Sequence, residues 1–242
     1  MINKIAFFCL YMFSFYSGYS QKLSGTVVYK VVSASVYDDR ENNERGKKMV
    51  EGRLASLAKQ TFLLEFTTSK SKFVRNNSLS INDDKGEQLY DKMATSYYSS
   101  SYDYYLDSSA GVGMFKYSRD GTLVTQQVKE KEWDISTESK KIGDYLCYKA
   151  VYIKKYMGRD GNMKTLPITA WFVPSLPYRY GPKQYYGLPG LILELHELFG
   201  VFLATDIKIG DDKNITIEFP KGKTITEEEY NARQAAFVIK SK

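Results

Sequence analysis

The stretch YGPKQYYGLPGLILEL, residues 180–195, is the most distinctive in the chain and decides how the chain is built. Proline holds φ at about −65° and glycine accepts positive φ, so Pro189-Gly190 predicts a type II turn with positive φ at Gly190. Gly181-Pro182 predicts an earlier turn in the same way. We therefore expect a rigid, doubly turned connection that leads into a central strand.

The residues that follow this corner predict a strand with apolar side chains on both faces. Leu191, Leu193 and Leu195 alternate along one face, and Ile192 lies on the other. Leu188 can pack inward as the chain bends. We interpret the stretch as architecture rather than chemistry, and its structural motif consists of Gly181, Pro182, Gly187, Leu188, Pro189, Gly190, Leu191 and Ile192.

Outside this stretch, short β-branched and aromatic segments alternate with glycine, asparagine and aspartate turns. Asp120-Gly121 predicts a two-residue hairpin turn, and residues 141–144 and 159–162 predict two more turns. A second alternating run begins after a break at residues 196–200, and NITIEF (residues 214–219) predicts a further strand. The pattern gives nine or ten strands and favours an antiparallel sheet over βαβ units.

Two helices are predicted. KKMVEGRLASLAK (residues 47–59) has apolar residues near helical spacing, although Gly52 weakens it. Near the other end, Thr226 followed by Glu229 fits a capping box. The predicted fold is mainly β: a curled antiparallel sheet, forming a bowl or incomplete barrel, with a short helix in the first third and a C-terminal helix. Such a sheet must close, curl or be covered at its edges.

GLPGLI, residues 187–192, is the motif that names the GLPGLI protein family, and this sequence resembles that family. The resemblance extends from about residue 25 to about residue 209. Other matching positions follow in the family's order: Trp133, Ile142-Gly143, Cys147, Lys149-Ala150, Trp171-Phe172 and Gly181-Pro182. The resemblance implies a secreted or periplasmic protein of a Gram-negative bacterium. It implies little about activity, because the family is largely uncharacterised.

The sequence is also similar to the N-terminal bowl-like domain of type II peptide-N-glycosidases, where that domain accompanies a separate catalytic part. No such part follows the motif here, and this difference counts against glycan hydrolysis. A looser likeness in strand order and end helices relates the sequence to the half-barrel lipoprotein carriers of the periplasm.

The first residues, MINKIAFFCLYMFSFYSGYSQ, have the pattern of a secretory signal. Lys4 supplies positive charge, residues 5–16 are apolar, and Gly18 and Ser20 are small residues before a cleavage site. The apolar part is shorter than the roughly 20 residues of a membrane-spanning helix. We therefore expect a signal peptide at residues 1–20, one domain at residues 21–242, and no stable membrane span after signal removal.

Charge and cysteine content exclude several classes of protein. The net charge is +6, but lysines and acidic residues are interspersed, so nucleic-acid binding is not expected. Cys9 leaves with the signal, so Cys147 has no partner for a disulfide. Cys147 lies in an apolar, strand-like segment, which predicts a buried and unreactive thiol.

The sequence offers few groups for catalysis. His196 is the only histidine, and Glu194, His196 and Glu197 are the weak enzymatic candidates; we predict them near a hairpin turn. One histidine and one cysteine cannot supply the usual zinc ligands, so no metal is expected. The acidic pairs at residues 38–39, 83–84 and 211–212 fit solvated turns better than calcium sites. No phosphate loop or dinucleotide motif occurs, and no cofactor is expected.

A tyrosine- and serine-rich segment, residues 95–111, fits either a mobile loop or edge hairpin, or a sticky contact surface. Our leading hypothesis is a non-catalytic envelope protein that holds an apolar or extended ligand in an aromatic-walled groove or docks a protein partner. The alternative is an accessory or hydrolytic domain acting on peptides or glycans. Possible binding residues are Tyr97, Tyr98, Tyr102, Tyr104, Tyr105, Tyr185 and Tyr186. A filled concave face would favour partner docking.

Overall fold

The computed structural model describes residues 24–33, 43–76, 84–158, 161–210 and 215–240, which form twelve strands and three helices. The strands are β1 Ser24–Ser33, β2 Thr61–Phe66, β3 Lys70–Asn76, β4 Tyr102–Asp107, β5 Val112–Tyr117, β6 Leu123–Gln127, β7 Asp134–Ile142, β8 Tyr145–Met157, β9 Met163–Val173, β10 Leu191–His196, β11 Gly200–Gly210 and β12 Thr224–Thr226. The helices are α2 Glu44–Lys59, α3 Lys85–Tyr98 and α4 Glu227–Lys240.

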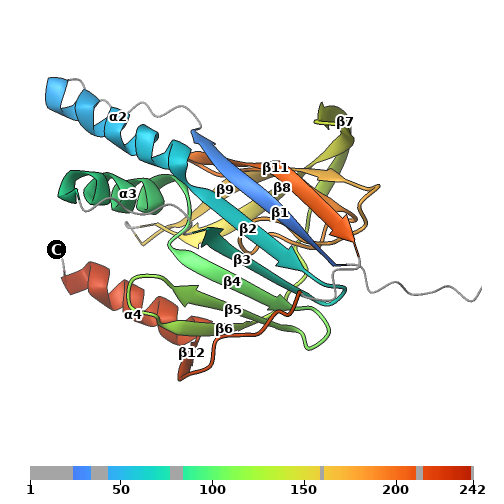
Figure 1. The fold of residues 1–242 in the computed structure, drawn as a ribbon. Helices are drawn as coiled ribbons and strands as arrows, with labels where there is room; N and C mark the ends of the chain where they lie inside the picture. Colours follow the sequence, from blue (N-terminus) through green and yellow to red (C-terminus); the bar gives the residue numbers. More distant parts are fainter. Residues whose placement is uncertain (1–23, 34–42, 77–83, 159–160, 211–214, 241–242) are drawn as a thin grey trace, which may run out of the picture.

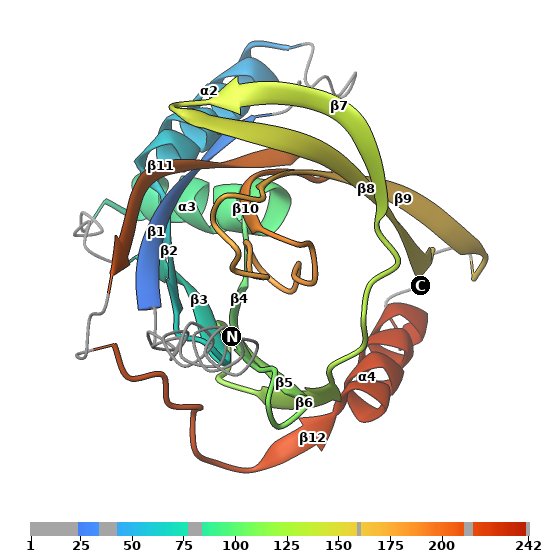
Figure 2. The ribbon, with the colours of Figure 1, turned by 90° about the vertical axis from the view of Figure 1, so that its right-hand side faces the viewer.

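All twelve strands belong to one sheet, in the order β12-β6-β5-β4-β3-β2-β1-β11-β10-β9-β8-β7. Every neighbouring pair is antiparallel except β12 and β6, which are parallel. The sheet curls strongly, but β7 and β12 stand at its two ends, so it does not close into a barrel (Figures 1 and 2). The predicted mainly β, curled architecture is confirmed.

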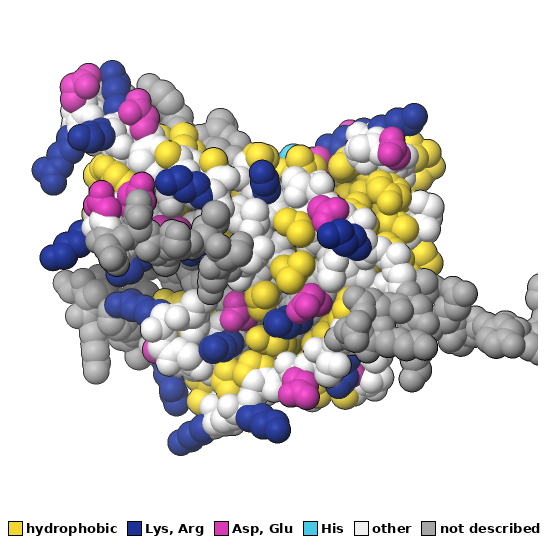
Figure 3. Space-filling model, viewed as in Figure 1, with side chains coloured by type: hydrophobic (Ala, Val, Ile, Leu, Met, Phe, Trp, Pro, Cys, Tyr) yellow, Lys and Arg dark blue, Asp and Glu magenta, His cyan; other side chains and the backbone are white. Residues whose placement is uncertain are grey.

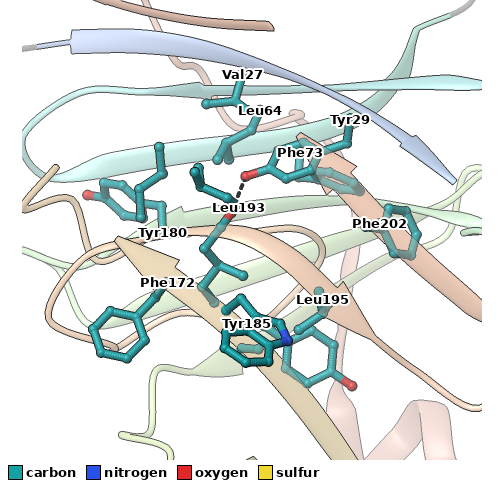
Figure 4. Packing of buried hydrophobic residues seen from close by; sticks show 14 of the residues in the cluster. Val27, Tyr29, Leu64, Phe73, Phe172, Tyr180, Tyr185, Leu193, Leu195 and Phe202 are labelled. Carbon is teal, nitrogen blue, oxygen red and sulfur yellow. Dashed lines mark hydrogen bonds between the residues drawn. The ribbon is translucent and has the colours of Figure 1, made fainter. Parts of the chain in front are cut away.

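The inner face of the sheet is apolar because alternate residues of its central strands point to the same side. On β1, Val27 and Tyr29 are fully buried and Val31 is nearly so. The Tyr29 hydroxyl donates a 2.6 Å hydrogen bond to the Ile192 carbonyl oxygen, drawn in Figure 4. This bond joins the centre of the sheet to the start of β10, so the far part of the chain is tied to its first strand.

Irregular pairing accompanies the curl. The register shifts within β1 at Val28/Tyr29, within β10 at Ile192/Glu194, and within β7 at Ile135/Ser139. Extra residues of this kind bend a strand and increase its twist. These shifts lie in the half of the sheet that bends over the interior in Figure 2.

Helices α2 and α3 lie side by side at one end of the sheet (Figure 1). The Asn43 side chain accepts a hydrogen bond from Gly46 N at the start of α2, and the Asp84 side chain accepts one from Gly86 N at the start of α3. Arg75 of β3 binds both carboxylate oxygens of Asp91 on α3. This ion pair fixes α3 to the sheet.

Three expectations about the chain between its motifs are corrected. The helix α3 was not predicted, and the segment at residues 95–111 is neither a mobile loop nor an edge hairpin: it contains the end of α3 and strand β4, which pairs with β3 and β5. Residues 215–219 form no strand. Instead this segment crosses the outer face of the sheet, where Ile217 is buried and the Phe219 ring lies 5.6 Å from that of Tyr105.

Several local predictions are confirmed. The hairpin at Asp120-Gly121 forms, with φ +75° at Gly121, but its loop is longer than the predicted two residues, because β5 ends at Tyr117 and β6 begins at Leu123. Gly143 adopts φ +56° in the turn between β7 and β8. Helix α2 covers the predicted segment at residues 47–59. The capping box of α4 forms as expected, because Glu229 N donates to Thr226 Oγ1 and Thr226 N donates to Glu229 Oε2, each at 3.1 Å.

Candidate functional site

The connection between β9 and β10, residues 174–190, lies inside the curled sheet (Figures 2 and 4). Tyr180, Tyr185 and Leu188 are each at most 5% exposed. The Tyr180 hydroxyl donates to the Thr68 carbonyl oxygen at 3.2 Å, which attaches the connection to the β2–β3 turn. The predicted inward packing of Leu188 is confirmed. So is the burial of the strand that follows, whose residues 191–195 are all buried.

The corner itself differs from the predicted type II turn. Gly190 does not have positive φ; Gly187 does, at +100°. Gly190 is required for another reason, because a Cβ atom at this position would lie 2.3 Å from the Val173 carbonyl oxygen. Glycine is therefore needed here because the two backbone segments lie so close together that no side chain fits between them.

Backbone hydrogen bonds hold the connection in its folded-back shape. Gly187 N donates to Arg179 O at 3.0 Å, Leu191 N to Leu176 O at 2.9 Å, and Ile192 N to Tyr180 O at 3.0 Å. These bonds join residues 176–180 to residues 187–192, so the two ends of the connection are tied to each other.

The connection also contacts the segment that runs from β6 to β7 across the open side of the sheet. Trp133 Nε1 donates to Tyr186 O at 3.0 Å, and the Tyr186 hydroxyl donates to Lys129 O at 2.9 Å. The Lys131 ammonium lies 5.0–5.9 Å from the ring centroids of Tyr152, Tyr185 and Tyr186. Burial lowers the pKa of Lys131, and nearby Lys154 lowers it further.

A polar cluster of Lys183, Tyr185 and Glu197 lies in the interior. Lys183 has φ +55°, an unusual value for a residue other than glycine, and its ammonium forms an ion pair with the Glu197 carboxylate. The Tyr185 hydroxyl donates to Glu197 Oε1 at 3.0 Å. Burial lowers the pKa of Lys183, an effect that Glu197 opposes, and burial also raises the pKa of Tyr185.

Little space remains beside this cluster. The crevice between the connection and the inner wall measures about 10 Å³, room for roughly one water molecule. Its lining includes Ser71, Tyr104, Lys183, Gln184 and Tyr185. Residues 174–190 therefore leave little room between themselves and this part of the inner wall.

Four of the seven predicted tyrosines, Tyr104, Tyr105, Tyr185 and Tyr186, line the crevice. The ring of Tyr105 also lies 5.6 Å from that of Phe219. Tyr102 and Tyr230 of α4 share a 2.8 Å hydroxyl–hydroxyl hydrogen bond, so α4 covers part of the inner wall as expected. Tyr98, the last residue of α3, is buried. The side chains of Tyr97 and of Ala235, Phe237 and Val238 lie outside the described residues.

Two of the three enzymatic candidates lie together, and the third lies apart from them. Glu194 and His196 share one face of β10 and contact each other, while Glu197 binds Lys183 in the interior. Lys140 Nζ donates to both carboxylate oxygens of Glu194, at 2.7 and 2.8 Å. Burial tends to raise the pKa of Glu194, but His196 and Lys140 together hold it below its usual value. A paired carboxylate of this kind is a poor general acid or base.

Cys147 is fully buried, as predicted, and lies near Lys140 and Glu194. Burial raises the pKa of its thiol to about 11, so the reactive thiolate is scarce at neutral pH. Its low reactivity stays a prediction.

Among the described residues, no group of three or more histidine, cysteine, aspartate and glutamate side chains is placed to hold a metal ion. The described helices also include none that is long and apolar enough to cross a membrane. The residues that sequence reasoning missed are Lys131, Lys140 and Lys183. Their partners are 14 to 55 positions away along the chain, so no local pattern marks them.

Comparison with known proteins agrees with this geometry. A model of the family described as "Protein of unknown function (Porph_ging)" matches residues 158–194, which include the GLPGLI motif. The resemblance to the GLPGLI family is confirmed by this match. No curated protein matches the chain.

The fold is similar to that of PNGF-II, a peptide-N-glycosidase F family protein, in two crystal forms. In the C2 form the TM-score is 0.52 at 12% identity, over 89% of this chain and 33% of that chain. In the P21 form the TM-score is 0.51 at 13% identity, over 86% and 32%. The chain thus spans about one third of PNGF-II, and the likeness is one of fold alone.

Proposed function

We propose that this protein is an exported, non-catalytic binding protein of the bacterial envelope that docks a protein partner. The observation that carries the proposal is the narrow crevice: residues 174–190 lie inside the curled sheet, and the crevice beside them measures about 10 Å³. Pockets for small ligands measure roughly 300–1,000 Å³. An outer surface is therefore a better place for recognition than the interior.

The outer surface has the mixed character that protein interfaces share. Figure 3 shows positive and negative side chains interspersed over much of one face, with apolar side chains gathered near β7. Ile135 of β7 and Leu146 of β8 are each 48% exposed. Exposed apolar residues beside charged ones suit a surface that is covered by another protein.

Hydrolysis by this chain has less support. Glu194 and His196 are engaged with each other and with Lys140, and Glu197 is engaged with Lys183. The second candidate, an accessory domain that works beside a hydrolase, is favoured by the similarity to one third of PNGF-II. Both candidates make the fold a docking module, and they differ in the partner.

Export is part of the proposal and rests on the signal-like residues 1–20. Cell fractionation tests it: the full chain should reach the periplasm or the medium, and a chain lacking residues 2–20 should stay in the cytoplasm. Equal cytoplasmic retention of both would contradict export.

The docking function is tested by mild affinity purification of the exported chain, with protein partners and extracted lipids both identified by mass spectrometry. A stoichiometric protein that co-elutes with the chain on gel filtration is expected, and an unrelated exported protein with the same tag is the control. A bound lipid without any protein would overturn partner docking. Release of glycans from a glycopeptide, lost in Glu194→Gln, would instead establish the hydrolytic alternative.

A further inference from the structure

The far ends of β8 and β9 form a two-stranded ribbon that extends past their neighbours (Figure 2). β7 pairs with β8 only up to Asp134 opposite Val151, and β10 pairs with β9 only up to His196 opposite Thr169. Residues 152–157 of β8 and 163–168 of β9 therefore pair only with each other. Each has one edge that pairs with no other strand in the described part of the chain.

The direction of the backbone groups at these edges follows from the register. Gly158 N donates to Asn162 O. Because hydrogen-bonded and non-hydrogen-bonded pairs alternate along antiparallel strands, the even-numbered residues of β8 form the hydrogen bonds to β9. The pairing of Ile153 with Pro167, which has no N–H, fits the same alternation. The N–H and C=O groups of Ile153, Lys155 and Met157 consequently point away from β9, towards the open edge.

The two edges of the ribbon differ in their capacity to accept another strand. On the β9 edge, the outward position at Pro167 has no N–H to donate, which blunts that edge. The β8 edge contains no proline, and its side chains are accessible: Ile153 is 48%, Tyr156 38% and Met157 62% exposed. Three of its six residues, Tyr152, Ile153 and Tyr156, are of types enriched in strands.

We propose that the β8 edge, residues 152–157, docks an extended acidic segment of a partner protein as an added β-strand. This inference rests on the proposed docking function and names its surface and the chemistry of its partner. Strand addition supplies main-chain hydrogen bonds for affinity, and side chains supply specificity.

Charge selects the acidic partner. Lys154 and Lys155 lie on opposite faces of the edge, and neither forms an ion pair with a described residue. The described part of β8 and β9 carries no acidic side chain. Adjacent acidic residues in an added strand would meet one lysine on each face, and their valine or threonine neighbours would cover Ile153 and Met157.

The same lysines disfavour a second copy of this chain. Antiparallel pairing of two β8 edges centred on Lys155 would place the two Lys155 side chains directly opposite each other. Like charges in that position destabilise a pair of strands. A heterologous acidic strand therefore fits this edge better than self-association.

A labelled ten-residue peptide with a central Glu-Glu pair between valine and threonine residues tests the proposal by fluorescence anisotropy with the full chain. The same peptide with lysine in place of glutamate is the control for charge. Lys155→Pro removes the edge-facing N–H and should weaken binding at least about tenfold, as should K154E/K155E. Thr165→Pro, on the other free edge of the same ribbon, should leave binding within about twofold.

Hydrogen exchange gives a readout that does not depend on a variant folding. On addition of the acidic peptide, the amides of Ile153 and Lys155 should exchange more slowly, while those of Lys154 and Tyr156, already bonded to β9, should not change. Equal affinity for the two peptides, or unchanged exchange at Ile153 and Lys155, would overturn the proposal. Dimerisation in sedimentation that Lys155→Pro abolishes would overturn it in favour of self-association.

The outcome also separates this inference from the proposed function. A natural partner that binds wild type and Lys155→Pro equally would leave docking in place and remove the β8 edge. If no protein partner is found but the peptide binds at this edge, the proposed docking function is wrong and the inference about the β8 edge stands.

Discussion

The two ends of β9 belong to regions that behave in opposite ways. At the end near Val173, residues 174–190 fold into the curled sheet and bury Tyr180, Tyr185 and Leu188. At the end near Met163, the ribbon of residues 152–157 and 163–168 projects away and keeps Met157 and Met163 more than 60% exposed. The most distinctive motif of this chain is thus buried inside the sheet, whereas a hairpin without a distinctive motif has an exposed strand edge.

Proline and glycine have different tasks in the two segments. Gly190 allows the connection to approach the Val173 carbonyl oxygen, and Gly181 lies against Ile192. At both positions the absence of a side chain allows close packing. Pro167 removes a donor from an exposed edge. The glycines thus support packing in the connection, and the proline limits pairing of the β9 edge with other strands.

The largest effect should come from the buried ion pair of the connection. Lys183→Met leaves the Glu197 carboxylate buried without its cation, and we expect the free energy of unfolding to fall by about 3 kcal/mol. The double variant K183M/E197Q should recover part of that loss. Urea unfolding followed by tyrosine and tryptophan fluorescence measures both. An unchanged midpoint in the single variant would mean that the connection is held by its apolar residues alone.

The next effect concerns the corner glycine. Gly190→Ala places a Cβ against the Val173 carbonyl and should lower the free energy of unfolding by about 2 kcal/mol. Gly210→Ala is the matched control, because no atom lies within 4 Å of its added Cβ; its effect should stay below about 0.5 kcal/mol. Equal melting temperatures for the two variants would contradict close packing at the corner.

A smaller effect depends on pH and involves the cluster on β10. The pKa of Glu194 is lowered in the folded protein, so its contribution to stability is fully present above the ordinary value of 4.5 and is lost as pH falls through the folded pKa. Below pH 4.5, the loss of stability on acidification should be about 1 kcal/mol smaller in Glu194→Gln than in the wild type. Thermal unfolding between pH 7 and 3 measures it. Parallel curves for wild type and variant would show that the Lys140 and His196 contacts contribute nothing.

The smallest effect should occur in the ribbon. K154E/K155E changes two side chains that form no ion pair with described residues, so the free energy of unfolding should change by less than about 0.5 kcal/mol. Chemical denaturation checks this value. A large loss of stability would mean that the ribbon belongs to the folded core, which would erase the contrast with residues 174–190.

Much of the fold could be predicted from short-range patterns. Alternation marked β1 and β11, Asp120-Gly121 marked a hairpin, and Thr226 with Glu229 marked the start of α4. These signals are local, since each depends on residues within a few positions of one another. Helix α3 was not predicted because its three tyrosines and one serine have weak helix propensity, and because Arg75 and Asp91, whose ion pair fixes it, come from different elements.

The candidate site was less predictable for the same reason. Sequence proximity suggested that Glu194, His196 and Glu197 act together, but the change from β10 to the following turn sends Glu197 to Lys183 and leaves the other two near Lys140. Successive strand residues point to opposite faces, and a turn then redirects the next side chain. Neighbours along the chain were therefore separated in space.

The sequence by itself determined the mainly β class, the burial of Cys147 and the rigid corner at residues 187–192, because hydrophobic alternation and turn residues act over a few positions. Only the tertiary structure decided that the corner lies inside the curled sheet, that Gly190 is needed for close approach, and that the edge of residues 152–157 is left open. These outcomes depend on register and on contacts such as Tyr29 with Ile192, which are 163 positions apart. Contacts over such distances leave no local pattern, since their partners meet only after the sheet has curled.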